Sequence, residues 1–177
     1  NGMFKTTYNW HKDLWKIVLC QNKKEAHNDL KNIVKRGCAI MEATELGGYK
    51  AGAAAYETWI EYMTNPQYEA MDDDALRNKY WLHHAVVGNH AEARCYLGGF
   101  LSCRAQGDTS LQKAAKYFND IHDVCWKVWG VAGGINASDG YKCLREYIKR
   151  NEIKSLLYEI KELDRIAHEE LKAWLCK

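Results

Sequence analysis

The sequence predicts an all-α fold, an antiparallel bundle of six or seven helices with a long buried central helix. The 177 residues include only one proline, Pro66, and are 47% hydrophobic, a composition that favours helices. Between residues 80 and 102 the only permanently charged side chains are Glu92 and Arg94. A run of this kind is typical of a helix inside a bundle. Because no run of strands is indicated, we expect residues 1–177 to form a single helical domain.

The first half of the chain is predicted to hold three helices. In each, apolar residues recur every three or four positions and so line one side of a helix. Glycine adopts the left-handed conformation that closes helices, and a residue before proline leaves the helical region, so Gly47-Gly48 and Asn65-Pro66 are predicted boundaries. The predicted ranges are about 8–21, 24–46 and 50–64.

The second half is predicted to hold the central helix and two further helical segments. The acidic triplet at residues 72–74 is interpreted as the N-terminal cap of the central helix, because capping and the helix dipole both favour negative charge there. The glycine-rich residues 130–140 lack the ending of a phosphate-binding loop and are predicted to be a linker. The predicted helical ranges are about 72–105, 110–129 and 139–176, the last broken near Asn151.

Small residues follow one stripe of the predicted central helix and would let another helix approach closely. Two further stripes carry apolar side chains, so we expect other helices to surround this helix on most sides. The small residues are Gly88, Ala91, Cys95, Gly98 and Ser102.

Charge and cysteine content narrow the classes of function. Lys and Arg total 25 and Asp and Glu total 23, a net charge of +2 without a basic block, so no nucleic-acid partner is predicted. The seven cysteines form no CxxC pair and are interpreted as reduced core thiols of a cytoplasmic protein. The residues that follow Met3 are not a signal peptide, and polar and charged residues within 82–102 argue against a membrane span.

Glu92 and Arg94 are the first candidate site residues. They lie two positions apart and so point to different faces of a helix, and each needs a partner on another helix. One interpretation is a pair of buried ion pairs that fix helix register. The other is a ligand pocket in which Arg94 holds a carboxylate or phosphate and Glu92 holds an amine or hydroxyl.

Two histidines and two aromatic residues complete the candidate ligand-binding set. His83 and His90 lie seven positions apart, whereas zinc ligands on one helix usually lie three or four apart, so no metal and no cofactor are predicted. Tyr56 and Trp59 are interpreted as core aromatics whose polar tips could line an apolar cleft. His90 and Cys95 fall on different sides of the helix, and no catalytic residue is assigned.

Two segments together resemble a known family. Residues 52–59 carry the pattern Gly-x-x-Ala-Tyr-x-x-Trp, and residues 92–97 carry Glu-Ala-Arg-x-x-Leu, ahead of a closing helix with Glu-Leu-Asp-Arg from residue 162. Over about residues 24–175 this order resembles the helical C-terminal half of butirosin-biosynthesis-H-like proteins. The resemblance implies a cysteine-peptidase-like half whose catalytic Cys and His would precede residue 1.

These observations lead to one predicted function and two alternatives. We expect a non-catalytic helical module that binds a small molecule or a partner, including its own cysteine-peptidase-like domain. The first alternative is the helical half of an acyltransferase or amide hydrolase whose catalytic Cys lies outside this chain. The second is a metal-dependent bundle hydrolase.

Overall fold

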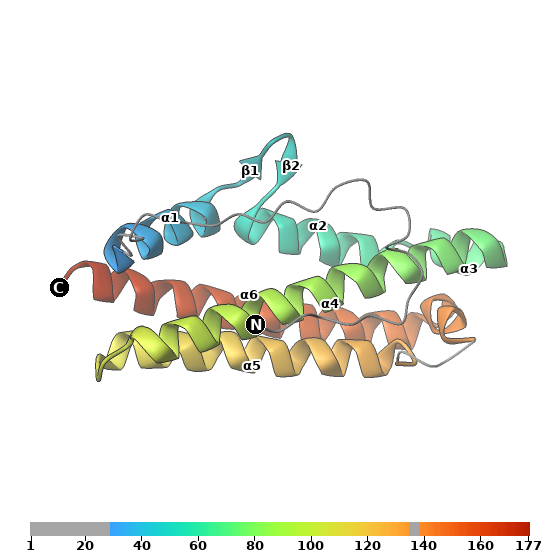
Figure 1. Ribbon diagram of the computed structural model, residues 1–177. Helices are drawn as coiled ribbons and strands as arrows, with labels where there is room; N and C mark the ends of the chain where they lie inside the picture. Colours follow the sequence, from blue (N-terminus) through green and yellow to red (C-terminus); the bar gives the residue numbers. More distant parts are fainter. Residues whose placement is uncertain (1–28, 135–138) are drawn as a thin grey trace, which may run out of the picture.

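The computed structural model describes residues 29–134 and 139–177 (Figure 1). These residues form seven helices and one two-stranded hairpin, which confirms the predicted all-α bundle. The helix predicted over residues 8–21 lies outside the described residues. The elements are α1 (Leu30–Glu42), β1 (Glu45–Leu46), β2 (Tyr49–Lys50), α2 (Gly52–Thr64), α3 (Gln67–Ala70), α4 (Asp73–Arg104), α5 (Thr109–Val131), the 3₁₀ helix η2 (Gly140–Arg145) and α6 (Tyr147–Leu175).

The long helices α4, α5 and α6 run side by side in alternating directions (Figure 1). α5 packs extensively on both α4 and α6. α1 and α2 follow one another along the upper side of the bundle in this view, and both rest on α6. The bundle therefore has a tightly packed three-helix part and a layer of two shorter helices.

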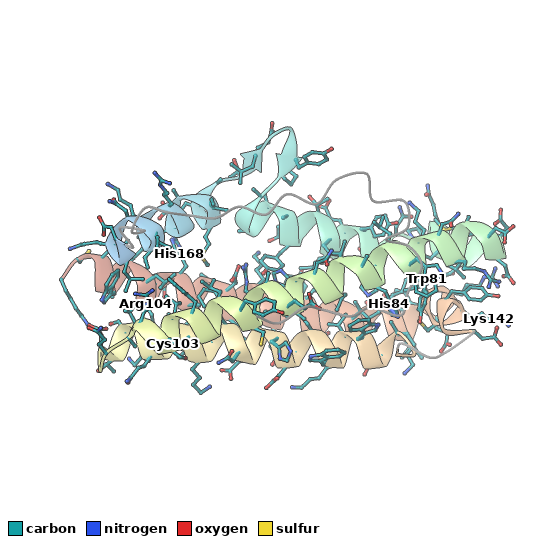
Figure 2. All side chains as sticks on the ribbon, viewed as in Figure 1. Trp81, His84, Cys103, Arg104, Lys142 and His168 are labelled. Atoms are coloured by element: carbon teal, nitrogen blue, oxygen red, sulfur yellow. The ribbon has the colours of Figure 1, made fainter. Side chains whose placement is uncertain are left out.

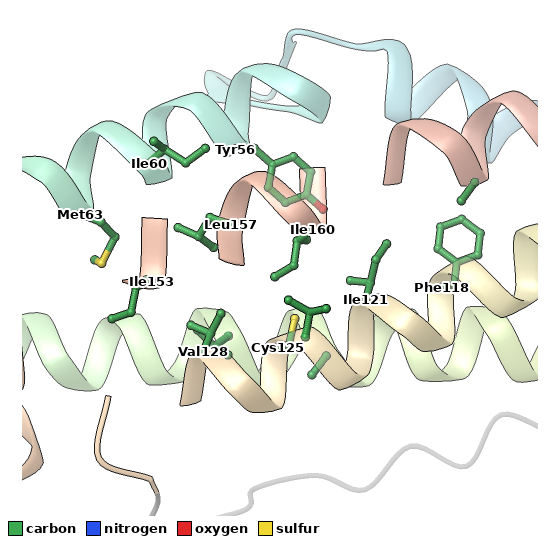
Figure 3. Close-up of a cluster of buried hydrophobic side chains, with 14 of the residues drawn as sticks. Tyr56, Ile60, Met63, Phe118, Ile121, Cys125, Val128, Ile153, Leu157 and Ile160 are labelled. Atoms are coloured by element: carbon green, nitrogen blue, oxygen red, sulfur yellow. The ribbon is translucent and has the colours of Figure 1, made fainter. Parts of the chain in front are cut away.

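Side chains of α2, α4, α5 and α6 form most of the core, and Figure 3 shows a part to which α2, α5 and α6 contribute. On each helix its residues recur at three- or four-residue spacing, as amphipathic helices require. The core side chains labelled in that view are Tyr56, Ile60 and Met63 of α2, Phe118, Ile121, Cys125 and Val128 of α5, and Ile153, Leu157 and Ile160 of α6.

Gly47 and Gly48 form a hairpin turn, which corrects the prediction that they end a helix. α1 ends at Glu42, and β1 pairs with β2 through Glu45 opposite Lys50. The two glycines have φ values of 57° and 83°. Two consecutive residues with positive φ match the twist of antiparallel strands, so this dipeptide favours a hairpin over a helix end.

The predicted start of α4 is confirmed. The Asp72 side chain accepts a hydrogen bond from the Ala75 backbone N–H at 2.8 Å. The next residue has a second role, because Asp73 accepts hydrogen bonds from Tyr141 at 3.0 Å and from Arg145 at 2.6 Å. The acidic triplet thus caps α4 and also anchors η2 beside it.

The break predicted near Asn151 lies elsewhere. η2 ends at Arg145, Glu146 is extended, and α6 then continues to Leu175. The buried Arg150 guanidinium donates to the Leu144 and Arg145 carbonyl oxygens, both at 2.8 Å. These bonds satisfy carbonyl groups at the end of η2, so the chain turns there while Asn151 remains helical.

α4 is the predicted long helix of 32 residues, but it is buried along one side only. The expectation that other helices cover it on most sides is wrong, because Trp81 is 60% and Tyr96 is 74% exposed. His84 lies on the buried side, with its ring 5.4 Å from that of Trp129 on α5 (Figure 2). The α1–α2 layer rests on α6, so nothing among the described residues covers the outer face of α4.

The cysteines also depart from the predicted core positions. Among the described residues Cys38 and Cys125 are buried, whereas three others are exposed. The exposed ones are Cys95, Cys103 and Cys176. Cys95 and Cys103 lie on the outer face of α4, which the prediction took to be covered. Within residues 29–134 and 139–177, no helix is both long and apolar enough to cross a membrane.

Candidate functional site

Four polar side chains from three helices form one hydrogen-bonded network. The Tyr56 hydroxyl of α2 donates to Asp164 Oδ2 of α6 at 3.1 Å, and Arg94 Nη2 of α4 donates to the same oxygen at 2.9 Å. His90 Nε2 of α4 lies 2.8 Å from the Tyr56 oxygen. Because the single Tyr56 proton goes to Asp164, His90 donates its Nε2 proton, and its Nδ1 is left as an acceptor.

Helical periodicity places these four residues. His90 and Arg94 lie four positions apart and share one face of α4. Tyr56 lies on the buried face of α2, seven residues before Met63. Asp164 lies between Ile160 and Ala167 on the buried stripe of α6, where an apolar residue would ordinarily stand.

A second hydrogen-bonded pair lies next to this network. Trp59 Nε1 donates to His83 Nδ1 at 3.3 Å, and the Trp59 ring meets the His90 ring edge to face with centroids 6.3 Å apart. Since the Trp59 N–H can only donate, His83 accepts through Nδ1 and carries its proton on Nε2. That Nε2 is buried and has no hydrogen-bond partner among the described residues.

Burial shifts the titration of these groups. Burial, followed by the charge of Arg94, lowers the pKa of His90 to about 3, and burial with His84 lowers the pKa of His83 to about 4. Burial and the Asp164 charge raise the pKa of Tyr56 well above its ordinary value. Burial lowers the pKa of Arg94, but its interactions with Asp164 and Tyr56 raise the pKa by more, so the pKa of Arg94 lies above its ordinary value. At neutral pH the site therefore holds a charged Arg94–Asp164 pair with neutral histidines and a neutral tyrosine.

The network forms part of the lining of a groove of 710 Å³ between α2 and α4, here called the α2–α4 groove. Its lining is mostly apolar and aromatic. It is formed by Ile40, Met41, Gly48, Tyr49, Lys50, Gly52, Ala55, Tyr56, Thr58, Trp59, Tyr62, Leu82, His83, Val86, His90, Arg94 and Asp164. A smaller cavity of 380 Å³ reaches Tyr56 and Asp164 from the side of Lys161 and His168.

The α2–α4 groove brings together five of the six candidate residues. These five are Tyr56, Trp59, His83, His90 and Arg94. Arg94 has the partner on another helix that was predicted, and its side chain is 19% exposed. Glu92 is exposed to solvent, which corrects the expectation that it is buried. Two residues turn a helix through about 200°, so Glu92 points away from the side that Arg94 occupies.

Asp164 is the site residue that the sequence analysis missed. The sequence does contain a signal for it, a lone carboxylate on the apolar stripe of α6. Because carboxylates are rarely buried unless they are paired, such a residue indicates a charged partner on another helix. The apolar neighbour Leu163 is only partly buried, whereas Asp164 is 6% exposed. An error of one position in assigning the buried side of this helix is therefore enough to miss Asp164.

The thiols of Cys125 and Cys143 are not activated as nucleophiles. Burial raises the pKa of Cys125 to about 12 and that of Cys143 to about 11, opposite to the shift that activates a nucleophile. Within residues 29–134 and 139–177, no group of three His, Cys, Asp or Glu side chains is placed to hold a metal ion.

Comparison of the chain with protein-family models, with curated proteins and with solved structures finds no match. The assignment of function therefore depends on the geometry and chemistry of the α2–α4 groove.

Proposed function

We propose that this chain is a non-catalytic helical module that binds a small molecule in the α2–α4 groove. The observation that carries the proposal is the buried network of Tyr56, His90, Arg94 and Asp164 in a groove with mostly apolar walls. Pockets for small molecules typically combine apolar walls with a few convergent polar groups, in volumes of about 300–1,000 Å³. The groove volume of 710 Å³ lies within this range.

The titration of the site supports binding rather than acid–base catalysis. A general acid or base works best with a pKa near the operating pH. The pKa of His90 is lowered to about 3 and the pKa of Tyr56 is raised, so both move away from neutrality. The same groups suit a binding site, because their protonation states are fixed over the physiological pH range.

The binding proposal is tested with the neutral fluorescent probe N-phenyl-1-naphthylamine. Wild-type protein should bind it saturably with increased emission, because the groove offers an apolar wall formed by residues such as Trp59, Leu82 and Val86. The variant Val86→Arg places a charged side chain in the groove and should abolish saturable binding. Val86 is 41% exposed, so the arginine can reach solvent and the fold should persist by circular dichroism.

The matched control is Asn89→Arg, one turn further along α4 at an exposed position outside the groove. This variant should bind the probe as the wild type does. If wild-type protein shows no saturable binding, or if Val86→Arg binds as well as Asn89→Arg, the proposed site is wrong.

The non-catalytic part of the proposal is tested with p-nitrophenyl hexanoate, an activated ester with an apolar chain. We expect hydrolysis by the chain to be no faster than in a matched solution of denatured protein, because none of the described cysteines lines the groove and the pKa values of His90 and His83 are lowered to about 3 and about 4. Turnover that saturates with ester and is lost in Val86→Arg would instead identify the groove as an active site.

One observation favours the alternative function, the helical half of an acyltransferase or amide hydrolase. The two motifs behind the family resemblance contain Tyr56, Trp59 and Arg94, and all three line the groove. In a longer protein the groove would then shape an acceptor pocket for a nucleophile supplied from outside these residues. Both functions share the prediction that the groove binds a small molecule.

A further inference from the structure

The α2–α4 groove has a polar end and an apolar end. Tyr56 meets His90 and Trp59 meets His83, so residues later in α2 face residues earlier in α4. Arg94 therefore lies at the end near the hairpin, and Leu82 lies toward the other end. A ligand that fills the groove has to be amphipathic, with its head group beside Arg94 and Asp164.

The polar end carries charges that compensate each other. Arg94 and Asp164 form an ion pair with 2.9 Å between nitrogen and oxygen. His90 beside this pair is neutral, because burial and the charge of Arg94 lower its pKa to about 3, and His83 further along the groove is neutral as well, with a pKa lowered to about 4. The remaining charged residue of the groove is Lys50, which is exposed on the hairpin, where water screens its field. A charged head group beside a compensated pair would lose hydration without gaining an uncompensated partner.

At this end of the groove, a hydrogen-bond donor and a hydrogen-bond acceptor both lack a partner among the described residues. Arg94 Nε is a donor and Asp164 Oδ1 is an acceptor. Both atoms are buried and have no hydrogen-bond partner among the described residues. Buried polar groups without partners are unfavourable, so a ligand head that supplies an acceptor and a donor side by side gains from both.

We propose that the α2–α4 groove binds a neutral amphipathic molecule of the carboxamide class, with an aliphatic or aryl body and an amide head. The amide oxygen accepts from Arg94, the amide N–H donates to Asp164, and the body lies against Trp59, Leu82 and Val86. This inference rests on the proposed small-molecule function and specifies the chemistry of the ligand.

The test compares three ligands that share one tail and differ in the head: octanamide, octanoate and octylamine. Each is titrated against wild-type protein loaded with N-phenyl-1-naphthylamine, and displacement of the probe gives its affinity. Octanamide should bind about tenfold more tightly than either charged ligand, which is the gain of roughly one matched hydrogen bond. Equal affinities, or tighter binding of octanoate or octylamine, would overturn the inference.

Two variants make the test sharper by changing the charge of the groove. Asp164→Asn leaves Arg94 uncompensated and should shift the preference to octanoate. Arg94→Gln leaves Asp164 uncompensated and should shift it to octylamine. The control Glu92→Gln, at an exposed position of the same helix, should keep the wild-type order. If either groove variant fails to fold, the comparison of the three ligands on wild-type protein still tests the carboxamide assignment.

The outcomes separate the two proposals. If the probe does not bind wild-type protein, the small-molecule function itself is wrong. If the probe binds and is lost in Val86→Arg but the amide is not preferred, the function stands and the carboxamide assignment is wrong.

Discussion

Asp164 ties three helices together through one oxygen atom. Its Oδ2 accepts from Tyr56 of α2 and from Arg94 of α4, while the residue itself belongs to α6. A buried carboxylate on an apolar stripe is costly unless its charge is paired, and here Arg94 supplies the opposite charge. The network therefore links α2 and α4 to α6, and Arg94 has an ion-pair partner on another helix, as the interpretation of it as part of a buried ion pair requires.

Removal of one partner of this ion pair should destabilise the fold strongly. Arg94→Met keeps much of the apolar stem but leaves the Asp164 carboxylate buried and uncompensated, so we expect a loss of about 3 kcal/mol in the free energy of unfolding. Adding Asp164→Leu to this variant should recover most of the loss, because the uncompensated charge is removed as well. Urea unfolding measures both effects.

The control is Glu92→Met, also on α4 but exposed, which should change the free energy of unfolding by less than about 0.5 kcal/mol. Similar losses in Arg94→Met and Glu92→Met would show that the Arg94–Asp164 pair does not hold the helices together.

The buried histidines should make stability depend on pH. His90 has a pKa of about 3 in the folded chain, against an ordinary value of 6.5, so the folded state binds fewer protons than the unfolded state. Its contribution is complete above pH 6.5 and is lost as the pH falls toward 3. Between pH 7.5 and pH 5 we expect a loss of about 2 kcal/mol from His90 and a similar loss from His83.

Urea unfolding across this range checks the prediction, because the ordinary pKa values of carboxylates lie below it. The variant His90→Gln keeps an N–H donor for Tyr56 without a titrating ring, so its loss of stability over this range should be about 2 kcal/mol smaller than that of the wild type, while His83 and His84, whose pKa values are also lowered, still contribute. An unchanged pH dependence in His90→Gln would show that His90 does not titrate as described.

At the scale of elements, α4 approaches the backbone of α5 closely at Gly98. A methyl group at Gly98 would contact the side chain of Asn119 and lie 2.9 Å from the Ala115 carbonyl oxygen of α5. The neighbouring Gly99 has no atom within 4 Å of the same position. The close approach predicted from the small-residue stripe is therefore confirmed at Gly98, whereas Cys95 and Ser102 on that stripe are exposed.

These two glycines form a matched pair for mutation. Gly98→Ala should lower the free energy of unfolding by about 2 kcal/mol, because a backbone carbonyl of α5 has to move to make room. Gly99→Ala should raise it by about 0.5–1 kcal/mol, since alanine is the better helix former. Thermal or urea unfolding measures both changes. If the free energy of unfolding changes in the same direction in the two variants, the described packing of α4 on α5 is contradicted.

Sequence patterns were informative where one helix alone sets the outcome. The cap at Asp72 and the break at Pro66 depend on local chemistry, and the structure has helix ends close to both. The open face of α4 could not be read in this way, because it depends on where the α1–α2 layer rests. Asp164 was missed for the related reason that an error of one position exchanges a buried and a partly buried side chain.

At the scale of the whole molecule, the groove exists because α2 rests on α6 rather than on α4. The rings of Tyr56 and Trp59 stand between α2 and α4 and meet His90 and His83 edge to face. Polar contacts through these side chains thus replace direct packing between the two helices. The layer of α1 and α2 packs on one long helix, α6, whereas α5 packs extensively on two, α4 and α6.

This arrangement predicts two levels of local stability. Elements with fewer packed neighbours open at a lower free energy than the global core. In native-state hydrogen exchange at low urea concentrations, amides of α2 should exchange through a smaller opening than those of α5. Tyr56→Phe removes the hydroxyl that links α2 to Asp164 and should lower the opening free energy of α2 by about 1 kcal/mol or more. Opening free energies that are the same for α2 and α5, in wild type and variant alike, would instead show that the layer and the three long helices unfold as one unit. In that case the groove could not widen for a ligand without loss of the whole fold.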